Sequence, residues 1–358
     1  MKKELKKLSK KMVEMKEKFK HIYLSKKSKV ALLTHTDMDG SGSAILLRHF
    51  FKNVYFVKHL INYSMDKRIL ETILDEELME SIDVLFITDI SCSIETAIII
   101  EKSKYSKKIV LLDHHGTAKE LNNFSFAFVV DSCKFSFNNL LYPNEVTIKT
   151  SGTTLTMDFL MSKGFYPKST KVLELAHTIG AYDNWDWVNV FEKNKKYSNL
   201  NTLFQIYEQR RFEDVFVEKL KNNKKLFGKT EVLLLELEES KIENYVYKTS
   251  KLFDTFNISI EGREYFAIFA NADRYYMEVF DKMMELYPTA ELLIVNNNGK
   301  ISLRTRKEDV DVSMIAKAVG GGGHTQAAGF SMFDENKSSF FTLLETKLNA
   351  TISFIQEN

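Results

Sequence analysis

The sequence lacks the features that mark secreted, membrane-spanning and duplex-DNA-binding proteins. Only two cysteines occur among 358 residues, Cys92 and Cys133, and they form no C-x-x-C pair. We therefore expect buried, reduced thiols rather than a disulfide framework or a thiolate zinc site. No apolar run reaches the roughly 18 to 20 residues that cross a bilayer, and the N-terminus lacks the apolar core of a signal peptide. These absences predict a cytoplasmic protein without a membrane partner.

An excess of charge of one sign is also missing. Lys and Arg total 50 against 48 Asp and Glu, which leaves a net charge of +2. Duplex DNA is therefore not expected as a partner, and any preference for anions must come from a local site. The length and the 44% hydrophobic content are sufficient for two domains, each with its own core.

Residues 1–28 are rich in lysine and carry apolar residues in steps of three and four, which predicts an amphipathic helix. Packing of this helix on its own domain is favoured over a contact with an RNA backbone or a membrane surface. The apolar positions are Leu5, Leu8, Met12, Met15, Phe19 and Ile22.

Three continuous apolar runs follow, at residues 30–33, 84–87 and 109–112, with helical patterns between them. Continuous runs are typical of strands that are covered on both faces, and their alternation with helices predicts a mostly parallel α/β sheet. We assign this domain to residues 29–200. Ligands of such sheets bind beyond the carboxyl ends of the strands, so the residues after each run are the candidates for chemistry.

The rest of the chain predicts a helical connector and a smaller domain. Residues 201–251 are polar, have helical spacing, lack proline and contain one glycine, Gly228. In residues 252–358, two apolar runs flank Asn297-Asn298-Gly299, which predicts a β-hairpin. A glycine cluster and a final helix complete the expected smaller α/β domain.

Acids and histidines gather after the three apolar runs. Each alone could be a helix cap or an exposed side chain. A parallel sheet, however, brings the three strand ends to one edge, where so many carboxylates would repel one another unless cations compensated them. Carboxylates and imidazoles without thiolates predict two divalent ions, manganese first, with magnesium or cobalt as alternatives. The residues are His35, Asp37 and Asp39, then Asp89, then Asp113, His114 and His115, and finally Asp183 after a helical pattern.

These residues also resemble a known family. The pattern His35-x-Asp37-x-Asp39-Gly40, Asp89, Asp113-His114-His115 and Tyr182-Asp183 resembles the four signature motifs of DHH phosphoesterases. Residues 301–304, Ile-Ser-Leu-Arg, followed by Gly320-Gly321-Gly322-Gly323-His324, resemble the signature of the DHHA1 substrate-binding domain. The family includes nano-RNases, RecJ-type exonucleases, cyclic-dinucleotide phosphodiesterases and family II pyrophosphatases. Only Thr36 separates His35 from Asp37, whereas family II pyrophosphatases and many nano-RNases have three residues there, a difference that counts against a pyrophosphatase.

The resemblance implies a role for each matching residue. One metal would be held by His35, Asp37 and Asp89, and the other by Asp39, Asp89, His114 and Asp183. Catalytic roles are implied for Asp89, which would bridge the metals, for Asp113, which would fix the histidines, and for His115, which would face the substrate phosphate. Substrate binding in a cleft between the domains is implied for His115, Arg304, Gly321, Gly322, Gly323 and His324.

Two of these features also have a physical interpretation of their own. Consecutive glycines let backbone N–H groups approach an anion closely, with a flexible linker as the alternative. Arg304 can form a bidentate contact with phosphate, whereas Arg306 fits a solvated surface charge equally well. Near Asp183, Trp185 and Trp187 favour packing around the metal site over stacking on a nucleobase.

The leading functional hypothesis is a metal-dependent phosphodiesterase that degrades short oligoribonucleotides or linear dinucleotides to mononucleotides. An adenosine 3′,5′-bisphosphate phosphatase or a cyclic-dinucleotide phosphodiesterase would use the same motifs. A non-catalytic nucleotide sensor is disfavoured by the complete set of ligands. A scaffolding protein would leave the acids at the strand ends unexplained. The sequence leaves open whether the protein forms a homodimer.

Overall fold

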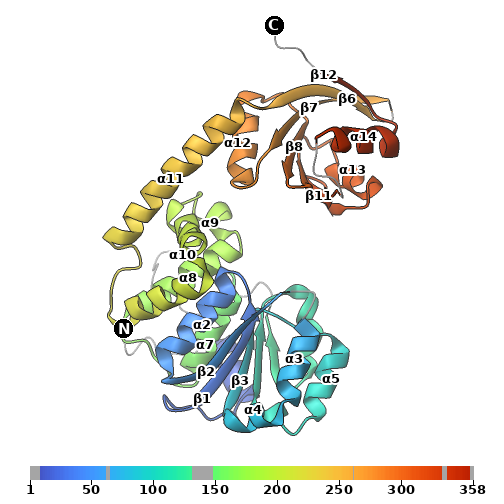
Figure 1. Cartoon of the computed structure of the whole chain (residues 1–358). Coiled ribbons are helices and arrows are strands. Elements are labelled where there is room, and N and C mark those ends of the chain that lie inside the picture. The colour runs from blue at the N-terminus through green and yellow to red at the C-terminus, as the bar shows by residue number, and fades with distance from the viewer. Residues whose placement is uncertain (1–8, 62–64, 131–147, 261, 333–336, 355–358) are drawn as a thin grey trace. The chain divides into compact units, whose positions relative to one another are not determined.

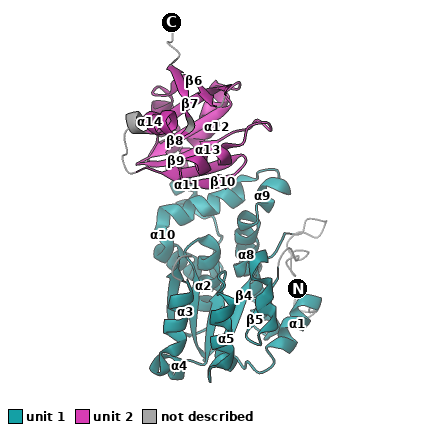
Figure 2. Ribbon diagram, turned by 90° about the vertical axis from the view of Figure 1, so that its right-hand side faces the viewer, with its two compact units in different colours: residues 1–235 teal, residues 236–358 magenta. Residues whose placement is uncertain are grey.

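The computed structural model describes residues 9–61, 65–130, 148–260, 262–332 and 337–354. Its chain divides into two compact units, residues 1–235 and 236–358, coloured separately in Figure 2. Among the described residues, every helix is too short or too polar to cross a lipid bilayer.

The first unit is built on a five-stranded parallel sheet with the order β2-β1-β3-β4-β5. The three strands predicted from the apolar runs are the central ones, and they are almost fully buried. The prediction of a parallel sheet is confirmed, and the structure adds one strand at each edge. The strands are β1 (Lys29–His35), β2 (Asn53–Leu60), β3 (Val84–Thr88), β4 (Ile109–Asp113) and β5 (Ala127–Val129).

Helices cover both faces of this sheet, as predicted (Figure 1). Alternate residues of one strand enter different cores: Leu32 packs with the helices of one face and Leu33 with those of the other. One face is covered by α2 (Met38–Phe50), α7 (Gly152–Ser162), α8 (Thr170–Asp183) and α10 (Lys195–Lys221), and the other by α3 (Met65–Leu74), α4 (Glu76–Ser81) and α5 (Ile94–Lys102). The shorter helices are η2 (Ser106–Lys108), η3 (Gly116–Asn123) and α9 (Asp186–Asn189).

The lysine-rich N-terminal segment packs on its own unit. Helix α1 (Lys10–Lys18) buries Met12 and Met15, and the ring of Phe19 meets that of Phe159 edge-on at 5.4 Å between centroids. Lys11 pairs with the buried Asp158, with 2.6 Å between Nζ and Oδ2. This arrangement supports the packed interpretation of the segment. Leu5 and Leu8 lie outside the described residues.

The predicted helical connector consists of α10, whose helical backbone is interrupted at Glu208, and α11 (Lys229–Ser250). Apolar residues of α10, such as Phe212 and Phe216, are fully buried in the core that α2 and α8 share. The boundary between the two units falls within α11. Helix α10 therefore contributes to the core of the first unit.

The second unit is a smaller α/β domain with a seven-stranded mixed sheet of order β10-β11-β9-β8-β7-β6-β12. The predicted hairpin is confirmed, because β8 and β9 are antiparallel and their turn has positive φ at Asn298 (48°) and Gly299 (79°). The strands are β6 (Asp254–Ile260), β7 (Arg263–Asn271), β8 (Leu292–Asn297), β9 (Lys300–Arg304), β10 (Gly322–His324), β11 (Ala327–Ser331) and β12 (Thr351–Phe354); the helices are α12 (Tyr276–Leu286), α13 (Val312–Ala318) and α14 (Lys337–Leu348).

The cysteine expectation holds only in part. Cys92 is half-buried rather than fully buried, and burial raises the pKa of its thiol to about 12, which keeps it protonated at neutral pH. Cys133 lies outside the described residues.

The glycine cluster belongs to the sheet of the second unit, so the flexible-linker alternative is wrong. Residues 322–324 form β10, which pairs with β11. A Cβ atom on Gly321 would lie 2.2 Å from the carbonyl oxygen of Gly329, whereas a Cβ on Gly322 would meet nothing within 4 Å. The two neighbouring glycines therefore have different reasons to be glycine.

This difference predicts unequal effects of two alanine substitutions. Gly321→Ala is expected to lower the free energy of unfolding by about 1–3 kcal/mol, because the new methyl group overlaps backbone that cannot move away. Gly322→Ala is the matched control and should leave stability unchanged. Chemical denaturation of both variants measures the difference, and equal stability of the two would contradict this packing.

Candidate metal centre

Acids and histidines from four segments of the first unit meet at the carboxyl ends of β1, β3 and β4. The structure forms three groups, and within each group one donor atom per residue lies within 4.8 Å of the others. No thiolate belongs to any of them. The groups are Asp89, Asp113, His114 and His115; His35, Asp37 and Asp89; and Asp39, His114 and Asp183.

The turn after β1 places His35 and Asp37 together. Asp37 is the N-cap of α2 and accepts a hydrogen bond from the backbone N–H of Gly40 at 2.9 Å. Its other carboxylate oxygen lies 2.6 Å from His35 Nδ1. Burial raises the pKa of Asp37, but the hydrogen bonds from His35 and Gly40 outweigh burial and hold it below its usual value. A Cβ on Gly40 would lie 2.2 Å from the carbonyl oxygen of His35, so this tight turn requires glycine.

Asp39 is held by the N-terminus of α7, a feature that the sequence interpretation missed. Its carboxylate accepts hydrogen bonds from Ser151 Oγ at 2.7 Å, Gly152 N at 2.6 Å and Thr153 N at 3.0 Å. The unpaired N–H groups and the dipole of a helix N-terminus stabilise a negative charge. A Cβ on Gly152 would lie 2.4 Å from the Cβ of Asp89, so glycine is needed there. The signal in the sequence was the Ser-Gly-Thr start of an apolar helix.

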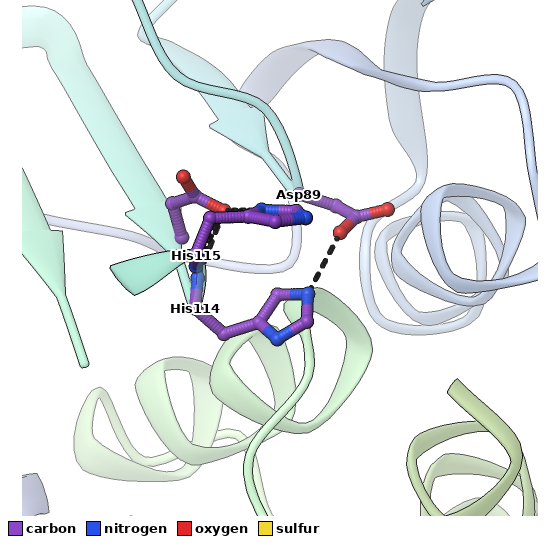
Figure 3. Close-up of side chains that lie close together, drawn as sticks. Asp89, His114 and His115 are labelled. Carbon is purple, nitrogen blue, oxygen red and sulfur yellow. Dashed lines mark hydrogen bonds and ion pairs between the residues drawn. The ribbon is translucent and has the colours of Figure 1, made fainter. Parts of the chain in front are cut away.

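Asp89 lies at the centre of the cluster, directly after β3. Its backbone is in the left-handed region at φ 59°, which an aspartate adopts at an energetic cost, and its side chain is buried. Burial, followed by repulsion from Asp39 and Asp37, raises its pKa well above the usual value. In Figure 3 the ring of His114 is turned toward this carboxylate.

The two histidines of the Asp-His-His segment at the end of β4 have different partners. His115 Nδ1 lies 2.8 Å from Asp113 Oδ1, and this hydrogen bond raises the pKa of His115 because it outweighs burial, which lowers it. Asp113 also accepts from the backbone N–H of His114 at 2.8 Å. His114 Nε2 instead lies 3.3 Å from Asp89 Oδ1 and 3.5 Å from Asp183 Oδ2. Asp113 is fully buried, whereas His115 is exposed.

The atoms at the centre of the site fit a divalent cation. Asp89 Oδ2, His114 Nε2 and Asp183 Oδ2 are buried, and none of them forms a hydrogen bond. Burial, with repulsion from Asp39 and Asp37, also raises the pKa of Asp183 well above its usual value. Buried polar atoms without hydrogen bonds are costly, and coordination of a cation would satisfy them and remove the repulsion between the carboxylates. The mixture of carboxylates and imidazoles suits a hard or borderline divalent ion.

The remaining predicted residues lie in the second unit. Arg304, Ala327 and His324 are paired across β9, β11 and β10, so the side chains of Arg304 and His324 share one face of the sheet. A side chain at position 322 would lie on this same face. The guanidinium of Arg304 lies over the ring of Phe280, at 5.9 Å from its centroid.

Other residues of this region point elsewhere. Gly321 and Gly323 pack tightly against β11. A Cβ atom added to Gly321 or Gly323 would lie 2.2 Å or 2.5 Å, respectively, from a carbonyl oxygen of that strand. Arg306 forms a solvent-exposed pair with Asp281, 3.6 Å apart, which supports its interpretation as a surface charge.

Comparisons with known proteins agree with this arrangement. Residues 29–178 match the DHH family N-terminal domain, and residues 278–350 match the DHHA1 domain. Oligoribonuclease NrnB of Bacillus subtilis strain 168 is 28% identical over 309 residues, which cover 85% of this chain and 73% of that protein.

Two solved structures are similar to this chain at low sequence identity. The pGpG-specific phosphodiesterase PggH of Vibrio cholerae aligns with a TM-score of 0.50 and 12% identity, over 90% of this chain and 99% of that one. RecJ of Thermus thermophilus, solved with Mn²⁺, aligns with a TM-score of 0.45 and 16% identity, over 95% of this chain and 55% of that one.

The chain therefore contains a DHH domain in its first unit and a DHHA1 domain in its second. It is a hydrolytic enzyme of the phosphoesterase class.

The site predicts opposite effects of two Asp→Asn substitutions on the metal-free protein. Asp89→Asn removes a repelling charge and should leave the metal-free protein at least as stable as the wild type. Asp39→Asn places an NH₂ group against donors of α7 and should lower the free energy of unfolding by about 1–3 kcal/mol.

Thermal melts with and without Mn²⁺ measure both effects. Mn²⁺ should raise the melting temperature of the wild type, because a ligand that binds the folded state stabilises it, but not that of Asp89→Asn. A metal-free Asp89→Asn variant less stable than Asp39→Asn would contradict this picture of the site.

Proposed function

We propose that the protein is a two-metal phosphodiesterase that hydrolyses short oligoribonucleotides and linear dinucleotides to mononucleotides. The observation that carries the proposal is the cluster of buried carboxylate and imidazole atoms without hydrogen bonds around Asp89. The similarity to oligoribonuclease NrnB supports the substrate class.

The residues of the three groups would hold two divalent ions, with Asp89 shared between them. His35 and Asp37 would complete one site, and Asp39, His114 and Asp183 the other. Manganese suits this mixture of ligands, with magnesium or cobalt as alternatives. Such a pair of ions lowers the pKa of a water molecule and stabilises the charge of the attacked phosphoryl group.

His115 would act on the substrate rather than bind a metal. Asp113 engages its Nδ1 atom, which fixes the ring and leaves Nε2 for the substrate. Its side chain is 55% exposed, so a phosphate can reach it. His115 orients the phosphate and donates a proton to the leaving oxygen. Asp113 is a positioning residue that keeps His115 in this orientation.

The second unit supplies residues that bind the substrate. Arg304 and His324 offer cationic and imidazole donors on one sheet face, and Gly322 keeps the surface beside them open. Guanidinium groups bind phosphate through paired hydrogen bonds. A cleft between the units, in which both parts act on one substrate, stays a prediction.

The function is tested by ranking initial rates of the manganese-loaded protein on a substrate panel. We expect 5′-phosphorylated di- to pentaribonucleotides to be cleaved faster than adenosine 3′,5′-bisphosphate, cyclic di-AMP and pyrophosphate. Replacing a residue that only hydrogen-bonds to a metal ligand typically lowers activity by roughly 10–100-fold. Asp37→Ala should lower activity by more than this, because it removes a residue that would bind the metal directly. Faster turnover of the bisphosphate or of cyclic di-AMP would establish the corresponding alternative activity instead.

The division of labour between the units predicts a kinetic difference. Arg304→Ala and His324→Ala should raise KM by about tenfold while the bound metal, measured by elemental analysis, stays unchanged. Arg306→Ala is the matched control on the same unit and should behave as the wild type. Loss of metal from the Arg304 or His324 variant would show that the proposed roles of the two units are wrong.

A further inference from the structure

Three aromatic rings form a stack beside the metal centre. The ring of Tyr182 stacks on that of Trp187 at 5.7 Å and an interplanar angle of 19°, and Trp187 stacks on Trp185 at 6.3 Å and 28°. Tyr182 directly precedes the predicted ligand Asp183 at the end of α8. The stack therefore begins at the metal centre and ends at the surface.

The outermost ring is exposed in a way that packing does not explain. Trp185 is 60% exposed, whereas Trp187 is partly buried against the core of the unit. The preference for packing drawn from the sequence thus fits Trp187 but not Trp185.

The backbone holds Trp185 in this position. Its φ of 59° is in the left-handed region, which costs energy for a bulky residue and is seen mainly where the surroundings enforce it. The next residue, Asp186, is buried and accepts a hydrogen bond from the backbone N–H of Lys149 at 2.7 Å. The turn is therefore fixed directly after the exposed ring.

A small cavity joins this stack to the metal centre. It has a volume of about 150 Å³, and its walls include Asp37, Asp39, Asp183, Tyr182, Trp185 and Trp187. Pockets for whole small molecules measure roughly 300–1,000 Å³, so this one accepts a single ring system. Its carboxylates repel a phosphate group that no cation accompanies, but they do not repel a neutral ring.

We propose that Trp185, backed by Trp187, is a stacking platform for a nucleobase adjacent to the scissile phosphate. Each base offers a flat face to an aromatic ring, so such a platform binds nucleotides without strict sequence preference. The amide of Asn201, which also lines the cavity, can reach the edge of a base. This assignment rests on the proposed function, because it takes the neighbouring acids as the site of phosphate cleavage.

The protein contains only two tryptophans, Trp185 and Trp187, so its tryptophan fluorescence reports on this platform alone. Titration of the manganese-loaded protein with AMP should quench the emission saturably, and ribose 5-phosphate, which lacks a base, should not. The quenching should persist in Trp187→Phe, which keeps Trp185, and fall in Trp185→Phe. No change with AMP, or equal changes with both ligands, would overturn the platform.

Kinetics give a second readout. Trp185→Ala should raise KM for a 5′-phosphorylated diribonucleotide by about tenfold, with kcat unchanged, and Trp185→Phe should restore most of the loss. An analogue of the dinucleotide without bases should show no such difference between wild type and Trp185→Ala. The control is Tyr23→Ala, which removes an aromatic ring that is 86% exposed just before β1 and should change nothing.

The two readouts separate this proposal from the proposed function. Turnover of short RNA with identical KM values for wild type and Trp185→Ala would overturn the platform alone. Quenching by AMP in a protein that cleaves none of the substrates would overturn the proposed function and leave a base-binding surface. Equal effects of Trp185→Ala on substrates with and without bases would show a merely structural role.

Discussion

The repulsion between carboxylates that share one buried site is the constraint on which the rest of the first unit depends. Two like charges 4 Å apart repel by about 4 kcal/mol at the effective dielectric constant of a protein surface. Asp89 is surrounded by Asp37, Asp39 and Asp183, and burial together with their repulsion raises its pKa well above the usual value. Such a cluster persists only if rigid neighbours hold it and positive charge compensates it.

The fold supplies that rigidity from several directions. The parallel strands β1, β3 and β4 are buried on both faces and fix the starting points of the acidic turns. The N-terminus of α7 binds Asp39, and glycines at positions 40 and 152 let backbone and carboxylates approach within distances that a Cβ would prevent. The left-handed backbone conformation of Asp89 costs free energy, and the contacts of the surrounding structure maintain it.

In the second unit, the pairing register of the strands decides which side chains each face of the sheet presents. One face of its sheet carries Ile301, Leu303 and Phe330 into a hydrophobic core. The opposite face presents Arg304 and His324. The register places them on the two strands that flank β11, each opposite Ala327. Because side chains alternate along a strand, a single pairing register both builds the core and exposes the polar residues.

The sequence by itself determined the central strands, the hairpin with its Asn-Gly turn, and the gathering of acids and histidines after the apolar runs. Each of these depends on local patterns: continuous apolar runs, turn residues that tolerate positive φ, and the topology of parallel sheets. The edge strand β2 was not identified, because residues such as Lys58 and His59 interrupt its apolar pattern.

Only the tertiary structure decided which partners the functional residues have. It placed the start of α7 against Asp39, which lies 112 residues earlier in the chain than Ser151. It also left Trp185 in solvent while Trp187 packed, although the two lie two positions apart in one motif. The physical reason is that burial and hydrogen bonding at these positions depend on contacts between segments distant in sequence, which local spacing does not encode.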